Sequence, residues 1–105
     1  MLLAEGKSIV SSLRQKGLKA EVVGGIYKKK EEIHDIDLIT RQSNGEKDLK
    51  ILREQNLECP VELYITSDKQ YKRLRDALRS TTYENITGHK MRGLRYSKVR
   101  IEENG

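Results

Sequence analysis

The sequence predicts an α+β domain in which a mixed β-sheet carries helices packed on one of its faces. Apolar residues recur at helical spacing over residues 2–16 and 68–79, whereas apolar and polar residues alternate, as in strands, over 34–40 and 61–66. The expected order is helix, two strands, helix, strand, helix, and then one or two strands. The 105 residues fit a single domain that covers 1–105.

The first part of the chain is expected to contain one helix and two strands. The helix covers residues 2–16, with its apolar side chains on one side and Gly17 as its stop. The first strand covers residues 19–27 and runs into a glycine pair. A polar turn over 28–33 then leads to the second strand over 34–40, whose side chains alternate between acidic and apolar.

The middle of the chain continues with a loop, a helix, a strand and a helix. Residues 41–45 carry the turn sequence Ser-Asn-Gly and are expected to form the loop. The helix covers 46–56, and the strand covers 61–66 after a proline. Ser67 is suited to cap the last helix, over 68–79, whose buried stripe is expected to be Tyr71, Leu74 and Leu78.

The last third of the chain is expected to form short strands over residues 83–86 and 94–101. Residues 68–101 contain ten Lys or Arg and only three acids, and the whole chain has a net charge of +5. A basic surface favours polyanionic partners, so Lys90, Arg92 and Arg95 are the candidate contacts for nucleic acid. The same charges are also compatible with a solvated surface that has no partner.

The composition restricts where the protein is expected to act. Cys59 is the only cysteine, so no intramolecular disulfide is expected, and its expected role is that of a small buried side chain. The two histidines and the scattered acids show no zinc-site spacing. No apolar run approaches the ~20 residues of a membrane span, and no signal peptide is recognisable. We therefore expect a soluble intracellular protein, in the cytoplasm or the nucleus, with no membrane partner.

A site for a nucleoside triphosphate and divalent metal is predicted where two glycines, three lysines and two aspartates follow one another over residues 24–37. Glycines let backbone N–H groups approach an anion, and lysines supply positive charge for phosphate. Asp35 and Asp37 would point from one face of a strand and can hold divalent metal. Glu62 is the candidate third carboxylate. Its alternative role is that of an ordinary polar residue on a solvated strand face.

Two blocks of the sequence resemble the palm of the DNA polymerase β (family X) nucleotidyltransferases. The first, VGGIYKKKEEIHDIDLIT over residues 23–40, is similar to the Gly-Gly-Phe-Arg-Arg-Gly-Lys and Gly-His-Asp-Val-Asp-Phe-Leu-Ile-Thr segments of the terminal-transferase branch. The two align without a gap over 24–37. The second block, VELYITSDKQY over 61–71, is similar to the strand of the third carboxylate and the Asp-Gln-Tyr turn after it. The resemblance implies a polymerase β-like nucleotidyltransferase palm.

The resemblance also implies a role for each matched residue. The pair Gly24 and Gly25 would shape the triphosphate-binding turn, and Lys28 falls where the family has a phosphate-contacting Arg. Two Mg²⁺ or Mn²⁺ ions would be the cofactors. The residues implied as catalytic metal ligands are Asp35, Asp37 and Glu62, the last at a position where the family usually has Asp.

The implied activity is transfer of a nucleoside monophosphate from a (d)NTP to a hydroxyl, with a nucleic-acid 3′ end as the expected acceptor. Because the resemblance covers only a palm, a partner chain is expected to supply the functions of fingers or thumb. Two alternatives stay open. Antitoxin-like small nucleotidyltransferases, which modify a protein hydroxyl, carry a glycine turn and an Asp-x-Asp at similar spacing. A palm that has lost catalysis would bind nucleic acid in a salt-sensitive way without needing Asp35 and Asp37.

Overall fold

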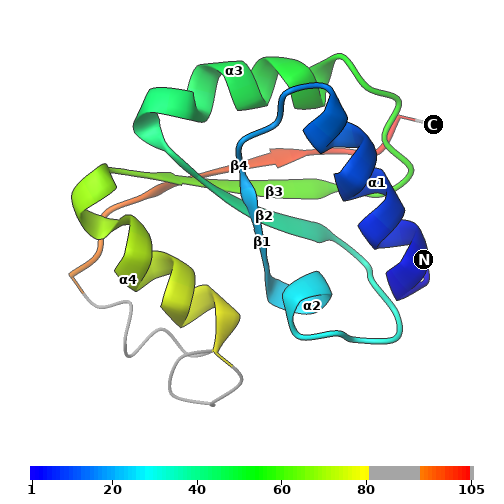
Figure 1. Ribbon diagram of the computed structural model, residues 1–105, viewed down its shortest axis with the longest axis horizontal. Helices are drawn as coiled ribbons and strands as arrows, with labels where there is room; N and C mark the ends of the chain where they lie inside the picture. Colours follow the sequence, from blue (N-terminus) through cyan, green and yellow to red (C-terminus); the bar gives the residue numbers. More distant parts are fainter. Residues whose placement is uncertain (81–92, 105) are drawn as a thin grey trace.

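The protein forms a four-stranded sheet with helices on both faces (Figure 1). The structure, a computed structural model, describes residues 1–80 and 93–104. The strand order is β1-β2-β3-β4; β1 is antiparallel to β2, β2 is parallel to β3, and β3 is antiparallel to β4. The elements are α1 (Leu3–Gln15), β1 (Glu21–Val23), α2 (Gly24–Tyr27), β2 (Ile36–Arg41), α3 (Gln42–Arg53), β3 (Val61–Thr66), α4 (Asp68–Arg79) and β4 (Ser97–Ile101).

The larger hydrophobic cluster lies between the sheet and the helices α1 and α3. Alternate residues of a strand point to the same face, so β2 and β3 each contribute a pair of fully buried aliphatic side chains to it. The helices α1 and α3 add their apolar stripes, as the sequence pattern predicts. The main members from these elements are Val10, Leu13, Ile36, Leu38, Leu52, Val61 and Leu63.

A second cluster, on the opposite face of the sheet, packs against α4. Val23 and Ile39 from the sheet meet Tyr71 and Leu74 from α4, together with Leu94. The expectation that all helices pack on one face was therefore wrong. Strand β2 is central and places apolar side chains on both of its faces, so both faces must be covered. The mixed sheet and the α+β class are confirmed.

Two further differences from the expected elements arise from glycines. Residues 24–27 form the short helix α2 instead of continuing the first strand, because Gly24 has a φ of +64° that an extended strand does not allow. The expected loop over 41–45 is instead the start of α3. There Gly45 lets the helix approach β3 so closely that an added Cβ would lie 3.2 Å from the Ile65 side chain.

Several expectations about single elements are confirmed. Helix α1 ends just before Gly17, whose φ is +103°, and helix α4 and strand β3 have the expected bounds.

Strand β4 starts at Ser97, so the expected strand over 94–101 is shortened. The expected strand over 83–86 lies outside the described residues. Within the described parts of the chain, no helix combines the length and the apolar character that a membrane crossing requires.

A buried carboxyl joins α3 to the neighbouring elements. Asp48 is fully buried, and its two oxygens accept hydrogen bonds from the Thr40 hydroxyl at 2.6 Å and from the backbone N–H of Lys19 at 2.9 Å. A buried polar group of this kind stabilises a fold only when its hydrogen bonds are made. Asp48 thus fixes the position of α3 relative to the end of β2 and the segment before β1.

We predict that Asp48→Ala lowers the free energy of unfolding by about 3 kcal/mol, because the Thr40 hydroxyl and the Lys19 N–H lose their acceptor inside the protein. Urea denaturation followed by circular dichroism measures the change. The matched control is Asp76→Ala on α4, where an exposed carboxylate lies 3.4 Å from Arg75, and the expected change is below about 0.5 kcal/mol. Equal losses in the two variants would contradict the role given to Asp48.

Candidate functional site

The candidate site is a row of charged side chains that crosses three strands of the sheet. In the strand register Asp37 of β2 lies opposite Glu62 of β3, which lies opposite Arg100 of β4. Neighbouring strands of a sheet lie about 4.7–4.9 Å apart, so residues paired in this way are immediate neighbours. Asp35 lies just before β2 and is bound to the same Arg100. The structure therefore brings the three predicted carboxylates together.

Arg100 neutralises two of these carboxylates. Its Nη1 lies 2.9 Å from Glu62 Oε1 and 3.4 Å from Asp35 Oδ2, and its Nη2 lies 3.4 Å from Asp35 Oδ1. Its Nε donates a hydrogen bond to Glu102 at 2.7 Å. These bonds, to Glu102 first and then to Asp35 and Glu62, raise the pKa of Arg100 above its ordinary value. Lys98 adds a second, more distant cation, 3.8 Å from Glu62.

Asp37 is the carboxylate of the row that has no ion pair within the described residues. Burial raises the pKa of Asp37 to about 7, and the charge of Glu62, a hydrogen bond with Glu62 and the charge of Asp35 act in the same direction. Close to neutral pH Asp37 therefore holds a proton well above the pH at which an ordinary aspartate releases it.

The glycine turn packs directly against Asp37. Gly24 lies after β1 with a φ of +64°, and an added Cβ would come within 2.3 Å of Asp37 Oδ2. Only glycine fits there, since another side chain would be strained by the backbone and would collide with the carboxylate. Gly25 is also close-packed, with a Cβ position 3.3 Å from Ile33. The next candidate, Lys28, ends α2 and donates its backbone N–H to the Gly24 carbonyl at 2.9 Å.

The donor atoms of the row suit a divalent cation, although they are engaged with other partners. Magnesium and manganese prefer carboxylate oxygens, and a cation can replace the proton that Asp37 holds near neutral pH. Asp35 and Glu62 are bound to Arg100, which would have to release them before all three carboxylates could act as ligands. Accordingly, outside residues 81–92 and 105 no group of three or more His, Cys, Asp or Glu is placed to hold a metal ion.

The predicted nucleic-acid contacts are placed only in part. Lys90 and Arg92 lie outside the described residues. Arg95 is exposed, and its backbone is fixed by hydrogen bonds with the side chains of Thr66 and Gln70. Site prediction from the sequence missed the partnership of Arg100 with the carboxylates, because it becomes visible only when β4 is paired with β3 in the correct register.

Two aromatic side chains extend the site along the same face. Tyr64 is two residues after Glu62, and its ring centroid lies 5.6 Å from that of Tyr96, which is 43% exposed. The ammonium group of Lys98 lies 5.8 Å from the Tyr64 ring. The exposed Tyr96 ring and the Lys98 cation, which both lie against Tyr64, offer a stacking surface and a positive charge to a nucleotide.

We predict that the stability of the protein falls as the pH rises from about 4 to 7 in the absence of metal. The raised pKa of Asp37 means that the folded state holds a proton that the unfolded state has already released in this range. The contribution is fully present at the acidic end and is lost above pH 7. Urea denaturation with EDTA between pH 4 and 8 should show an extra loss of about 2 kcal/mol relative to Asp37→Asn, since solvent screens part of the effect. Parallel pH profiles for the two proteins would contradict the raised pKa of Asp37.

A second prediction concerns the glycine turn. Gly24→Ala and Gly17→Ala both force alanine into a positive φ and should each cost about 1 kcal/mol or more. Only Gly24→Ala also displaces the Asp37 carboxylate, because the Cβ at position 17 would be 3.7 Å from its nearest neighbour. Carbon-13 NMR titration of the side-chain carboxyl of Asp37 measures this displacement. A changed titration in Gly24→Ala, with an unchanged one in Gly17→Ala, is the expected result. The same titration in both variants would show that the turn does not define the site.

The comparisons with known proteins leave the site to be interpreted from its own chemistry. Searches against models of protein families, curated proteins and solved structures found no match. The properties that characterise the site are the row of Asp35, Asp37 and Glu62, the glycine turn against Asp37, and the two cations from β4.

Proposed function

We propose that the protein is a metal-dependent nucleotidyltransferase, which transfers a nucleoside monophosphate from a (d)NTP to a hydroxyl and releases pyrophosphate. The observation that carries the proposal is the packing of the glycine turn against Asp37, which itself faces Glu62 across the parallel strands. Such an arrangement provides backbone groups for a triphosphate directly beside carboxylates for a divalent cation. The resemblance of residues 23–40 and 61–71 to the polymerase β palm supports the same activity.

Each residue of the site has a role in this proposal. Gly24 and Gly25 would form the turn that holds the triphosphate, and Lys28 would contact a phosphate. Asp35, Asp37 and Glu62 would hold two Mg²⁺ or Mn²⁺ ions, which supply charge neutralisation for the phosphates when bound. The acceptor oxygen forms a bond with the α-phosphorus while the bond to pyrophosphate breaks. The proton of the acceptor hydroxyl would pass to the Glu62 carboxylate.

A nucleic-acid 3′ end is the acceptor that the surroundings of the site support best. Lys98 lies beside Glu62, the exposed ring of Tyr96 lies against Tyr64 two residues further along β3, and this third of the chain is strongly basic. Positive charge favours a polyanionic acceptor, and an aromatic ring favours an unpaired base. A single-stranded end satisfies both preferences.

The test is incubation of the protein with labelled dNTPs or NTPs, Mg²⁺ or Mn²⁺, and single-stranded or primed oligonucleotides. We expect extension that falls on the order of a hundredfold or more in Asp35→Asn/Asp37→Asn, because the variant loses the carboxylates that would hold the phosphate-neutralising metal ions. The matched control is Asp76→Asn, which removes an exposed carboxylate of α4 and should leave the rate unchanged. Extension that is equal in both variants would contradict the proposed site.

A second candidate function is nucleic-acid binding without catalysis, and the position of Arg100 favours it. Arg100 already compensates Asp35 and Glu62, as expected for a row of charges that has become structural. This function predicts no extension, together with oligonucleotide binding that weakens with salt and persists in Asp35→Asn/Asp37→Asn. Labelling of a protein in a mixed extract, without extension of any oligonucleotide, would instead identify an enzyme that modifies protein hydroxyls.

A further inference from the structure

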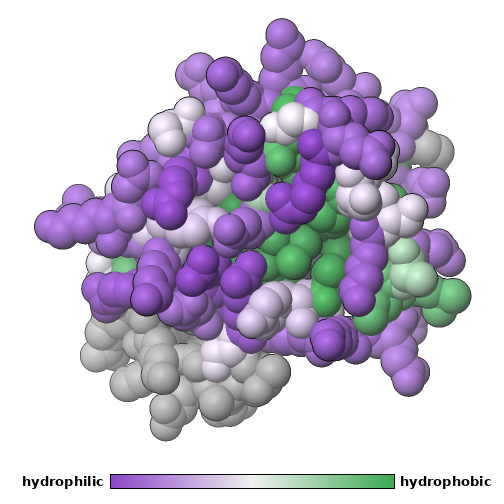
Figure 2. All heavy atoms as spheres, in the orientation of Figure 1, coloured by the Kyte–Doolittle hydropathy of each residue, from purple (hydrophilic) through white to green (hydrophobic). Residues whose placement is uncertain are grey.

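A groove of about 390 Å³ lies between α1 and the segment formed by β1 and α2, away from the carboxylate row. Val10, Val22 and Ile26 provide apolar side chains along it. Figure 2 shows an apolar region in this part of the molecule, between α1 and the β1–α2 segment, surrounded by hydrophilic side chains. An apolar hollow with a polar rim is characteristic of a surface that binds another molecule.

The rim of the groove is basic. Lys7 and Arg14 lie two turns apart on α1, on the same side of the helix as Val10, and Lys29 follows α2. No Asp or Glu is among the residues that line the groove. The occupant that fits this surface therefore has negative charges around an apolar centre.

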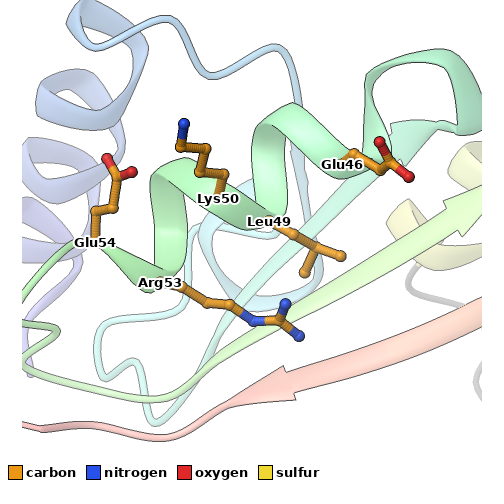
Figure 3. A pocket seen from close by; sticks show the side chains of 5 residues that line it. All are labelled: Glu46, Leu49, Lys50, Arg53 and Glu54. Atoms are coloured by element: carbon orange, nitrogen blue, oxygen red, sulfur yellow. The ribbon is translucent and has the colours of Figure 1, made fainter.

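A second hollow, beside α3, differs from the groove because its charges do not favour an acidic partner. Glu46 and Glu54 line it together with Lys50 and Arg53, so acids and bases are balanced (Figure 3). The same figure shows these charged side chains spread along α3 around a single aliphatic residue, Leu49. A balanced surface of this kind does not select the charge of a partner, and its cations provide a control for those of the α1 groove.

One wall of the groove is held in place from α4. The Arg79 guanidinium lies 4.3 Å from the centre of the Tyr27 ring, and its Nε donates a hydrogen bond to the Val22 carbonyl at 3.0 Å. Tyr27 is nevertheless 47% exposed, so its ring offers apolar area to an occupant. Because the outward carbonyl of Val22 is already bonded, an occupant would bind through its side chains rather than as an added strand.

We propose that this groove binds an acidic segment of a protein partner, one that inserts aliphatic side chains flanked by Asp or Glu. A second copy of this chain is disfavoured, since the net charge of +5 and the basic rims would repel each other. A nucleic acid would find charge at the rim but would leave the aliphatic floor without a complementary group. The proposal does not depend on the nucleotidyltransferase activity.

The test is titration of the ¹⁵N-labelled full chain, followed by NMR, with a synthetic amphipathic peptide that carries Leu on one helical face and Glu on the other. We expect chemical-shift changes at Val10, Val22, Ile26 and Tyr27. Affinity should fall about tenfold in Lys7→Glu/Arg14→Glu and remain unchanged in the matched variant Lys50→Glu/Arg53→Glu on α3. The four substituted residues are all exposed, and circular dichroism establishes that each variant is folded.

Three further ligands make the result decisive. A peptide with Lys in place of Glu should not bind, and a Glu peptide without Leu should bind at least about tenfold more weakly. Equal binding of the peptide without Leu, or of oligothymidylate at the same residues, would overturn the proposal, because charge alone would then explain it. So would equal losses in the two double variants, no binding of the amphipathic peptide, or self-association of the chain through these residues.

Discussion

The parallel pairing of β2 with β3 is the constraint on which both the fold and the candidate site depend. It places Ile36 beside Val61 and Leu38 beside Leu63 on one face, so that α1 and α3 have a continuous apolar surface to cover. On the other face the same register places Asp37 beside Glu62. A slip of one residue would exchange the two faces of a strand, burying a carboxylate and exposing an aliphatic side chain. Core packing and the position of the acids are therefore fixed by one interaction.

The charges of the site are balanced within the sheet rather than by solvent alone. Arg100 and Lys98 come from an edge strand and face carboxylates from the two central strands. Neighbouring carboxylates repel each other, and a cation of some kind is needed to hold them together. Arg100 meets this need for Asp35 and Glu62, whereas Asp37 meets it by keeping a proton near neutral pH. Catalysis would require Arg100 to release Asp35 and Glu62 to metal ions, whereas structural charge balance requires Arg100 to stay bound to them. The oligonucleotide assay distinguishes the two.

The sequence predicts the elements whose evidence is local and fails where the outcome depends on tertiary packing. The spacing of apolar residues predicts α1, α4 and β3, since each buries one recognisable stripe or face. The start of α3 could not be predicted, because a glycine after Ser-Asn indicates a turn in the sequence. In the structure Gly45 lies inside the helix, where its lack of a side chain allows α3 to pack closely against β3. The carboxylate row follows from alternation plus a resemblance. Its pairing with Arg100 does not, because the register of β4 is set by contacts far apart in the sequence.

The hydrogen bond from Arg79 to the Val22 carbonyl has a consequence for the solubility of the chain. Sheet edges attract further strands, and an unprotected edge is a starting point for aggregation. Strand β1 is only three residues long, and Arg79 occupies its outward carbonyl. At the opposite edge, β4 carries the long charged side chains of Lys98 and Arg100, and charged side chains on an edge strand hinder pairing with a further strand. Arg79 at one edge and the two cations beside the carboxylates at the other thus also protect the sheet against cross-β association.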